Sequence, residues 1–402
     1  MIKTELAPIN GFLYSAIHSG IKRMKKDLSL IVCPDGAVAA GTFTTNKTKA
    51  APVIFSEQNI KNPLVKAVVI NSGNANACTG VQGYKDATTT AQIAAELIGT
   101  DPGEILLSST GVIGVNLPMN AITSGLPKAF LKLSSHGLDE VAFGILTPDT
   151  MVKQFSTEVA LTDGTVATLS GIAKGSGMIH PNMATMLGFV MTDVNIDKST
   201  LTQMTKSIVD ETFNMVTVDG DTSTNDMFLV LSSCKLENQM IDTESSDYEA
   251  FKKGLTEIAK ALSISIAKDG EGASKLLTVK LSGAATLLDA RKLAKSVVSS
   301  SLVKAAFFGK DANWGRIICA LGYADAEFSP DNVTLKLAST GGTIELMHLG
   351  APVIFDEAFA LTVLDPDTID IIIELNQGNH SAEAWGCDLT YDYVKINGAY
   401  RT

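Results

Sequence analysis

The sequence of 402 residues lacks the usual features of membrane and secreted proteins. No stretch supplies the roughly 18 apolar residues of a membrane span, and the amino-terminal MIKTELAPING has no apolar core of a signal peptide. The five cysteines are odd in number and widely scattered, which fits neither a disulfide framework nor a Cys-x-x-Cys zinc motif. We therefore expect a cytoplasmic protein in which most cysteines are buried thiols.

Clusters of positive charge are also scarce. The chain has 32 basic and 43 acidic residues, and its formal net charge of −11 repels phosphate backbones and anionic lipids. The densest basic stretch, residues 22–26, is interpreted as a solvated surface turn. We expect no nucleic acid and no membrane among the partners.

Helical periodicity recurs along the whole chain. Apolar residues return every three or four positions over 91–98 and 248–262, which predicts two amphipathic helices. We expect a third helix after Asp197, which would be its N-cap, and a fourth from near Asp289 to Leu302.

Short apolar and β-branched runs lie between these helices, at 67–70, 187–191 and 369–373. Each is bounded by turn-forming residues, so each predicts a strand. No internal repeat or low-complexity linker interrupts the pattern, and the length allows two or three domains or one large unit. The fold class is therefore α/β, although periodicity does not give the stacking of the sheets.

The stretch NSGNANA at 71–77 directly follows the first of these strands. Asn and Gly favour tight turns and exposed amide groups, which makes the stretch a candidate site. The same residues are the usual choice for a loop that needs left-handed backbone. Both interpretations stay open.

Two motifs point weakly to metal or nucleotide chemistry. Carboxylates crowd the segment 217–226, but their spacing is not that of a calcium loop. Gly309-Lys310 is followed by Asp311, where a phosphate-binding loop has Ser or Thr. We therefore expect neither a bound metal nor a nucleotide.

The segment KGSGMIHPNMATML at 174–187 has an unusual junction. Small and turn-forming residues precede Thr185, which opens a strand. An amino-terminal threonine would supply both a nucleophilic hydroxyl and its own base, because an α-amino group has a pKa of about 7.7 to 8.0. Attack of the Thr185 hydroxyl on the Ala184 carbonyl, followed by hydrolysis of the ester, would create that terminus. The products would be residues 1–184 and 185–402.

Seven further motifs occur in order along the chain. They are TNKTKAAPV near 45, NSGNANACTG near 71, STGVIG near 109, TVDGDTSTND near 217, DGEGASK near 269, GKDANWGR near 309 and YVKINGAYRT at the end. With the segment 174–187, they closely resemble the bacterial glutamate N-acetyltransferase and ornithine acetyltransferase family of arginine biosynthesis. Members of that family mature by self-cleavage at an Ala-Thr bond.

The resemblance implies a set of site residues. The cleavage site would be Ala184 and Thr185, with Thr185 as the nucleophile, and the hydroxyl of Thr110 and the amide of Gly111 would form the oxyanion hole. The implied substrate contacts are Thr147, Lys174, Thr185, Glu271, Asn397 and Thr402. In a two-step exchange, Thr185 would carry acetyl from N2-acetyl-L-ornithine to L-glutamate, without metal or cofactor. Some family members also use acetyl-CoA, and the sequence leaves this open here.

The resemblance also implies an architecture. It is a four-layered α/β/β/α sandwich of the self-cleaving ornithine acetyltransferase type, with a smaller C-terminal α/β lobe at roughly 285–402. The chains 1–184 and 185–402 would be interwoven in one core, and two copies of each would assemble.

Two positions depart from the family pattern. Pro148 stands where many relatives have threonine, and it narrows the conformation of Thr147. Ser109 replaces a common threonine but keeps a hydroxyl.

Two alternative functions remain. A related aminopeptidase or amidohydrolase would pass the acyl group to water, and a catalytically silent relative would bind amino acids as one uncut chain.

Overall fold

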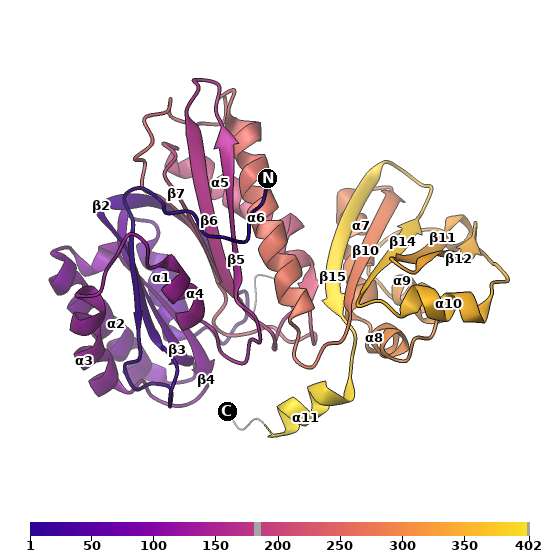
Figure 1. Cartoon of the computed structure of the whole chain (residues 1–402), viewed down its shortest axis with the longest axis horizontal. Coiled ribbons are helices and arrows are strands. Elements are labelled where there is room, and N and C mark those ends of the chain that lie inside the picture. The colour runs from indigo at the N-terminus through magenta and orange to yellow at the C-terminus, as the bar shows by residue number, and fades with distance from the viewer. Residues whose placement is uncertain (181–185, 400–402) are drawn as a thin grey trace.

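A computed structural model describes residues 1–180 and 186–399 of the chain. It is a mixed α/β structure with two mixed sheets and helices packed beside each (Figure 1). The first sheet has the order β4-β3-β2-β9-β7-β6-β5, and β1 pairs with β2. Its strands are β1 (Leu13–Ile17), β2 (Leu28–Phe43), β3 (Val65–Asn74), β4 (Ile105–Val112), β5 (Lys153–Ala160), β6 (Val166–Lys174), β7 (Leu187–Thr192) and β9 (Met227–Ser232).

The long strand β2 joins two halves of this sheet. Its first part pairs with β1 and β3, and its last part, residues 38–43, pairs with β9. The register of the β2–β3 pair shifts between Val32 and Ala37, where the strand passes from one half to the other. Such an irregularity bends a strand, so β2 can belong to two differently directed sets of strands.

Apolar side chains of β2 point alternately into two cores. Leu28 and Leu30 pack with the helices α2 and α3, whereas Ile31 shares a cluster with Phe189 of β7 and Leu229 of β9. The inner faces of the two halves therefore share one core. Helices cover the outer faces, with α5 and α6 packed against the half that contains β6 and β7. The helices of this region are α1 (Ala51–Asn59), α2 (Gly80–Ile98), α3 (Met119–Phe130), α4 (Leu138–Gly144), α5 (Lys198–Glu211) and α6 (Tyr248–Lys268).

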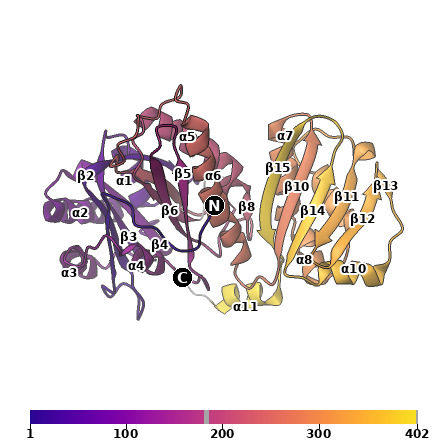
Figure 2. The ribbon, with the colours of Figure 1, turned by 45° about the horizontal axis from the view of Figure 1, so that its top comes forward.

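The second sheet forms a separate lobe with the order β13-β12-β11-β14-β10-β15-β8, and Figure 2 shows most of these strands side by side. Its strands are β8 (Val216–Thr217), β10 (Leu276–Ala284), β11 (Thr334–Ser339), β12 (Gly342–His348), β13 (Ala351–Pro352), β14 (Thr368–Glu374) and β15 (His380–Cys387). Its helices are α7 (Leu287–Ser299), α8 (Ser301–Phe308), α9 (Trp314–Gly322) and α10 (Glu357–Leu364). Short 3-10 helices are η1 (Pro102–Glu104), η2 (Phe213–Met215) and η3 (Pro330–Asn332).

Two elements connect the lobes. The helix α6 packs against β5 and β6 of the first sheet and against β15 of the second, and it lies between them in Figure 1. The helix α11 (Tyr391–Ala399) leaves the second lobe after β15 and extends towards the first lobe (Figures 1 and 2). These two helices place residues from distant parts of the chain near one another.

Most elements expected from periodicity are present. The runs 67–70, 187–191 and 369–373 lie within β3, β7 and β14, and the two amphipathic segments lie within α2 and α6. The Asp197 side chain accepts a hydrogen bond from the Thr200 amide, as expected of an N-cap.

Two expectations were wrong. The predicted fourth helix is two helices, because Ser300 has an extended backbone and its side chain caps α8 by accepting from the Val303 amide. Only Cys33 and Cys387 are buried, whereas Cys78 and Cys319 are exposed. In the described residues, no helix is long and apolar enough to cross a membrane.

Candidate active site

A cavity of about 320 Å³ brings together the ends of β4 and β6, the turn after α4, the segment after α6 and the helix α11. Six of the predicted site residues line it, namely Thr110, Gly111, Thr147, Lys174, Glu271 and Asn397. The remaining three, Ala184, Thr185 and Thr402, lie outside the described residues. The size is that of a small-molecule pocket.

The tip of β4 needs a glycine at position 111. Gly111 has a φ of +132°, and a Cβ added there would lie 2.3 Å from the carbonyl carbon of Gly73 on the neighbouring strand. Any side chain would push the two strand ends apart. The close pairing of these glycines therefore fixes the position of Thr110 beside the cavity.

Asparagine side chains hold the backbone around this strand end. Asn71 donates to the Ser109 hydroxyl at 2.6 Å, and Asn225 donates to the Ser109 carbonyl at 2.9 Å. Asn225 also donates to the carbonyl of Ala75, which lines the cavity. The serine at 109 thus uses the hydroxyl that the family's threonine would also offer. The stretch 71–77 extends β3 as far as Asn74, so part of the expected loop is strand.

Lys174, the last residue of β6, supplies a buried cation. Its side-chain nitrogen donates to the Thr110 hydroxyl over 3.5 Å, and the residue is only 5% exposed. Burial lowers the pKa of the Lys174 ammonium, and the nearby Asp149 carboxylate opposes that shift. Lys174 therefore places a buried amine at one wall of the cavity, and an anionic neighbour stabilises the charged form of this amine.

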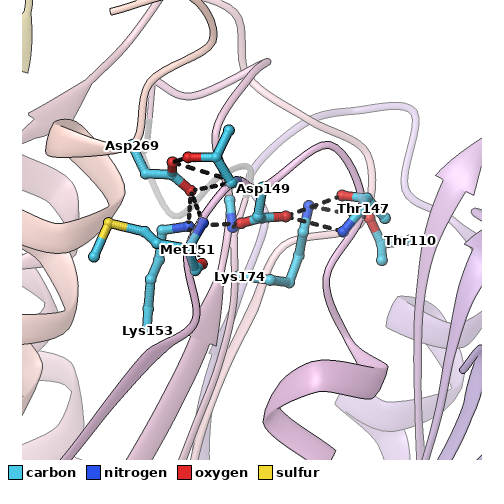
Figure 3. Close-up of polar contacts among 9 residues, drawn as sticks. Thr110, Thr147, Asp149, Met151, Lys153, Lys174 and Asp269 are labelled. Atoms are coloured by element: carbon cyan, nitrogen blue, oxygen red, sulfur yellow. Dashed lines mark hydrogen bonds and ion pairs between the residues drawn. The ribbon is translucent and has the colours of Figure 1, made fainter. Parts of the chain in front are cut away.

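Asp149 organises the turn beside Lys174. Its carboxylate accepts from the Thr147 amide at 2.9 Å, the Gly175 amide at 2.6 Å and the Lys153 ammonium at 2.8 Å. Burial would raise the pKa of Asp149, but the charges of Lys174 and Lys153 outweigh it and hold the pKa well below its usual range. Figure 3 shows both lysine side chains reaching towards this carboxylate. Because Asp149 binds the Thr147 amide directly, the position of Thr147 does not depend on a donor at Pro148.

Glu271 supplies the opposite charge. Asn397 of α11 donates to its carboxylate at 2.8 Å, which joins the C-terminal helix to the cavity. Burial raises the pKa of Glu271, while the Asn397 bond and the Lys174 charge act in the other direction. A Cβ at Gly177 would lie 2.3 to 2.4 Å from the Glu271 carboxyl group, so the absence of a side chain at 177 makes room for this carboxylate.

Asp226 lies just before β9, which together with β6 flanks β7. It is 2% exposed, and one carboxyl oxygen has no hydrogen-bond partner in the described structure. Burial raises the pKa of Asp226 well above its usual value against the pull of Lys174. The first residue of β7, Leu187, pairs with both Lys174 and Met227. In the sequence, Leu187 follows Thr185 by two positions.

Sequence reasoning missed several of these groups. Asp226 ends the acidic run 217–226 that was considered for metal binding, but within the described residues no group of His, Cys, Asp and Glu could hold a metal ion. Asp149 accepts from the amide of Thr147, two residues before it, whereas the carboxylate of an Asx turn binds the amide two residues after it, so local sequence gave no signal for this contact. The sequence also gave no signal for Lys153, because a lysine at the start of a strand is expected to be solvated.

One family model and two named relatives match nearly the whole chain. The model of the ArgJ family matches residues 13–402. The arginine biosynthesis bifunctional protein ArgJ 1 of Clostridium acetobutylicum is 49% identical over 96% of this chain and 95% of its own. The corresponding protein of Caldanaerobacter subterraneus subsp. tengcongensis is 47% identical over 98% and 97%. The crystal structure of arginine biosynthesis bifunctional protein ArgJ from Bacillus halodurans is 45% identical, with a TM-score of 0.52, and covers 54% of this chain and 100% of that chain. The chain belongs to the ArgJ family.

Proposed function

We propose that this protein moves an acetyl group from N2-acetyl-L-ornithine to L-glutamate, yielding ornithine and N-acetylglutamate for arginine biosynthesis. Near full-length similarity to proteins named for arginine biosynthesis supports the pathway. The observation that carries the chemistry is the cavity in which a buried lysine and a partly buried glutamate lie beside Thr110 and Gly111. An amino-acid substrate has a carboxylate and an amine, and Lys174 and Glu271 offer the complementary charges.

The proposed enzyme first cuts itself between Ala184 and Thr185. The hydroxyl of Thr185 attacks the Ala184 carbonyl and the peptide C–N bond breaks, which frees the Thr185 amino group and leaves Ala184 bound to Thr185 as an ester. Water then hydrolyses the ester, which restores the Thr185 hydroxyl and releases residues 1–184 with a free carboxyl group. The longer product would have 402 minus 184, or 218, residues, which is about 54% of the chain. The solved Bacillus halodurans chain is matched over its full length by 54% of this chain, which supports a separate chain of this size in that relative.

Acetyl transfer would then use the freed terminus in two steps. The α-amino group of Thr185 takes the hydroxyl proton while the oxygen attacks the acetyl carbonyl, and the tetrahedral intermediate expels ornithine, whose amine receives the proton. The neutral amine of glutamate then attacks the acetyl ester and restores the threonine hydroxyl. The Thr110 hydroxyl and Gly111 amide would stabilise each oxyanion, a contribution of about a hundredfold to a thousandfold per donor.

The remaining predicted contacts complete the proposal. Thr147, Asn397 and Thr402 would close the substrate pocket around the two charged residues, with no metal or cofactor. The word bifunctional in the names of the relatives supports a second activity, and we propose acetyl-CoA as the alternative acetyl donor for glutamate.

The architecture enters the same proposal. Helices outside two facing half-sheets that share a core support a four-layered α/β/β/α sandwich. The products 1–184 and 185–402 would be interwoven, because β7 and β9 pair with β6 and β2 in one sheet. The C-terminal lobe, expected at roughly 285–402, would begin with β10 instead. We propose two copies of each product in the assembly.

Intact-mass spectrometry tests maturation and the acetyl-enzyme together. The purified protein should give two fragments, of 184 and 218 residues, that are absent in Thr185→Ala. Brief incubation with acetylornithine should add one acetyl group to the larger fragment. One uncut and unlabelled chain would overturn the proposal and favour a silent binding relative.

A further inference from the structure

A buried charge cluster lies behind the cavity wall. Lys153, the first residue of β5, has a fully buried side chain whose ammonium is 2.8 Å from the Asp149 carboxylate and 2.5 Å from the Asp269 carboxylate. Both carboxylates are buried as well. Among the described residues, Lys153 does not line the cavity, so it can act on a substrate only through its partners (Figure 3).

Each carboxylate holds a different piece of backbone. Asp149 accepts from the amides of Thr147 and Gly175, the second of which directly follows Lys174. Asp269 accepts from the Thr150 amide at 3.1 Å, from the Thr150 hydroxyl and from the Met151 amide at 3.4 Å. The turn 147–151 is therefore held from both ends by the two partners of one lysine.

Asp269 also connects Lys153 to the segment that carries Glu271, the acidic residue of the cavity. Asp269 follows the end of α6 and precedes Glu271 by two residues. The Glu271 amide donates to the Ser176 carbonyl at 2.8 Å, which ties this segment to the one that follows Lys174. Through its two carboxylate partners, Lys153 is therefore connected to the three cavity segments that contain Thr147, Lys174 and Glu271.

Burying three ions is costly unless the arrangement is exact in geometry and each ion is compensated. An apolar residue in place of Lys153 would leave Asp149 with the charges of Lys174 and Lys22, and would remove the ion pair of Asp269 with Lys153. A purely structural contact needs no such ions, because well-packed apolar side chains are often as stable. The cluster is therefore suited to fixing a charged geometry rather than to filling space.

We propose that Lys153 is a positioning residue for acetyl transfer, which orders Thr147, Lys174 and Glu271 together by binding Asp149 and Asp269 at once. This inference rests on the proposed function. Lys153 lies outside the cavity, but it would hold both the cationic wall with Lys174 and the anionic wall with Glu271 in place. An amino-acid substrate would then meet both charges in their final positions.

The proposal has a consequence for pH dependence. The charged groups around Asp149 and its two lysine neighbours come from several elements: Lys153 on β5, Lys174 on β6, Lys22 before β2, Asp269 after α6, Asp226 before β9 and Glu271. Lys153 lowers the pKa of Asp149 both by its charge and by its hydrogen bond. Without it, Asp149 would take up a proton at a higher pH and release the Thr147 turn. The pKa of Asp149 in the intact protein lies too low to limit activity near neutral pH, so kcat/KM of a variant without Lys153 should fall more than that of the wild type as the pH is lowered.

The test compares Lys153→Met with the wild type in acetyl transfer from acetylornithine to glutamate, from about pH 5 to pH 9. We expect KM for acetylornithine to rise roughly tenfold at neutral pH, as for loss of one charged contact. This loss should grow as the pH falls from 9 to 5, because without Lys153 the buried Asp149 carboxyl takes up a proton more readily. A matched control is Lys304→Met, which removes a buried lysine of α8 that donates to the Cys387 carbonyl. This control should lose stability without moving the pH profile.

A second variant separates positioning from folding. Lys153→Met with Asp269→Asn removes one cation and one anion, so it should recover thermal stability relative to Lys153→Met. The additional loss of kcat/KM at low pH should remain, since Asp149 still lacks the Lys153 donor. A wild-type pH profile and KM in either folded variant would overturn the inference. Absence of transfer by the wild type would instead overturn the proposed function.

Discussion

A methyl group at position 177 should test the role of Glu271 with little damage to the fold. A Cβ there would lie 2.3 to 2.4 Å from the carbon and both oxygens of the Glu271 carboxyl group. These atoms form the far end of a flexible side chain, and Gly177 is not among the glycines with positive φ. The carboxylate must therefore move, while the backbone can remain in place. We expect Gly177→Ala to fold and mature normally.

The expected loss is that of one charged contact to the substrate amine. Such hydrogen bonds contribute about 1.5 to 3 kcal/mol, so KM for acetylornithine should rise roughly tenfold to a hundredfold. The displaced carboxylate also loses its 2.8 Å bond from Asn397, which should loosen α11. Steady-state kinetics with acetylornithine as the varied substrate measures the first effect, and amide exchange in α11 measures the second.

Two further variants test whether crowding of Glu271 causes the loss of affinity in Gly177→Ala. Gly177→Ala combined with Glu271→Asp shortens the displaced side chain and should recover part of the lost affinity if crowding is the reason. Gly322→Ala is the matched control, because an added Cβ at the end of α9 would meet nothing within 4 Å. An unchanged KM in folded Gly177→Ala would refute the reasoning that Glu271 contacts the substrate.

Other predictions concern the strand end, the buried acid and a histidine. Gly111→Ala forces a Cβ against Gly73, so it should lower the free energy of unfolding by roughly 2 to 4 kcal/mol and abolish transfer. A Gly111→Ala variant with full activity and the melting temperature of the wild type would contradict this. Burial raises the pKa of Asp226 in the folded state well above that of the unfolded chain, which is near 4, so the folded state binds this proton more tightly and stability falls as the pH rises above about 4. Asp226→Asn should remove this loss and melt no lower than the wild type at pH 7, and a lower melting temperature there would count against a neutral Asp226. His180 is half-buried, and desolvation first and the Lys295 charge second lower its pKa to about 4, so NMR titration should find a neutral ring at pH 6; a midpoint near 6.5 would contradict this desolvation.

The sequence predicted local structure well where a single pattern determines it. The β-branched run at 187–191 and the N-cap Asp197 needed no information from elsewhere in the chain, and both are present. The helix expected from Asp289 to Leu302 failed because apolar spacing continues across Ser300, while the serine side chain begins a new helix there. Periodicity does not detect such a break.

The site could be predicted only in part. The resemblance named six residues that now line one cavity, although they come from segments as distant as 110 and 397. It did not name Lys153 or Asp269 as site residues, although Asp269 opens the motif DGEGASK, and their pairing joins positions 116 residues apart. A lysine and an aspartate that far apart have no local pattern in common, so only the folded chain brings their burial and their contact into view. Gly177 was likewise part of a motif, but the carboxylate that needs its small size comes from position 271.

The most direct test of the account is the fate of the acetyl group. Acetylornithine labelled in the acetyl carbonyl would be incubated with the enzyme and glutamate, and the products separated by mass spectrometry. The account predicts that the label appears on the nitrogen of glutamate, with ornithine released in equal amount, and that Thr185→Ala forms neither. Label recovered as free acetate would instead identify a hydrolase, and would contradict transfer through an acetyl-threonine protected from water.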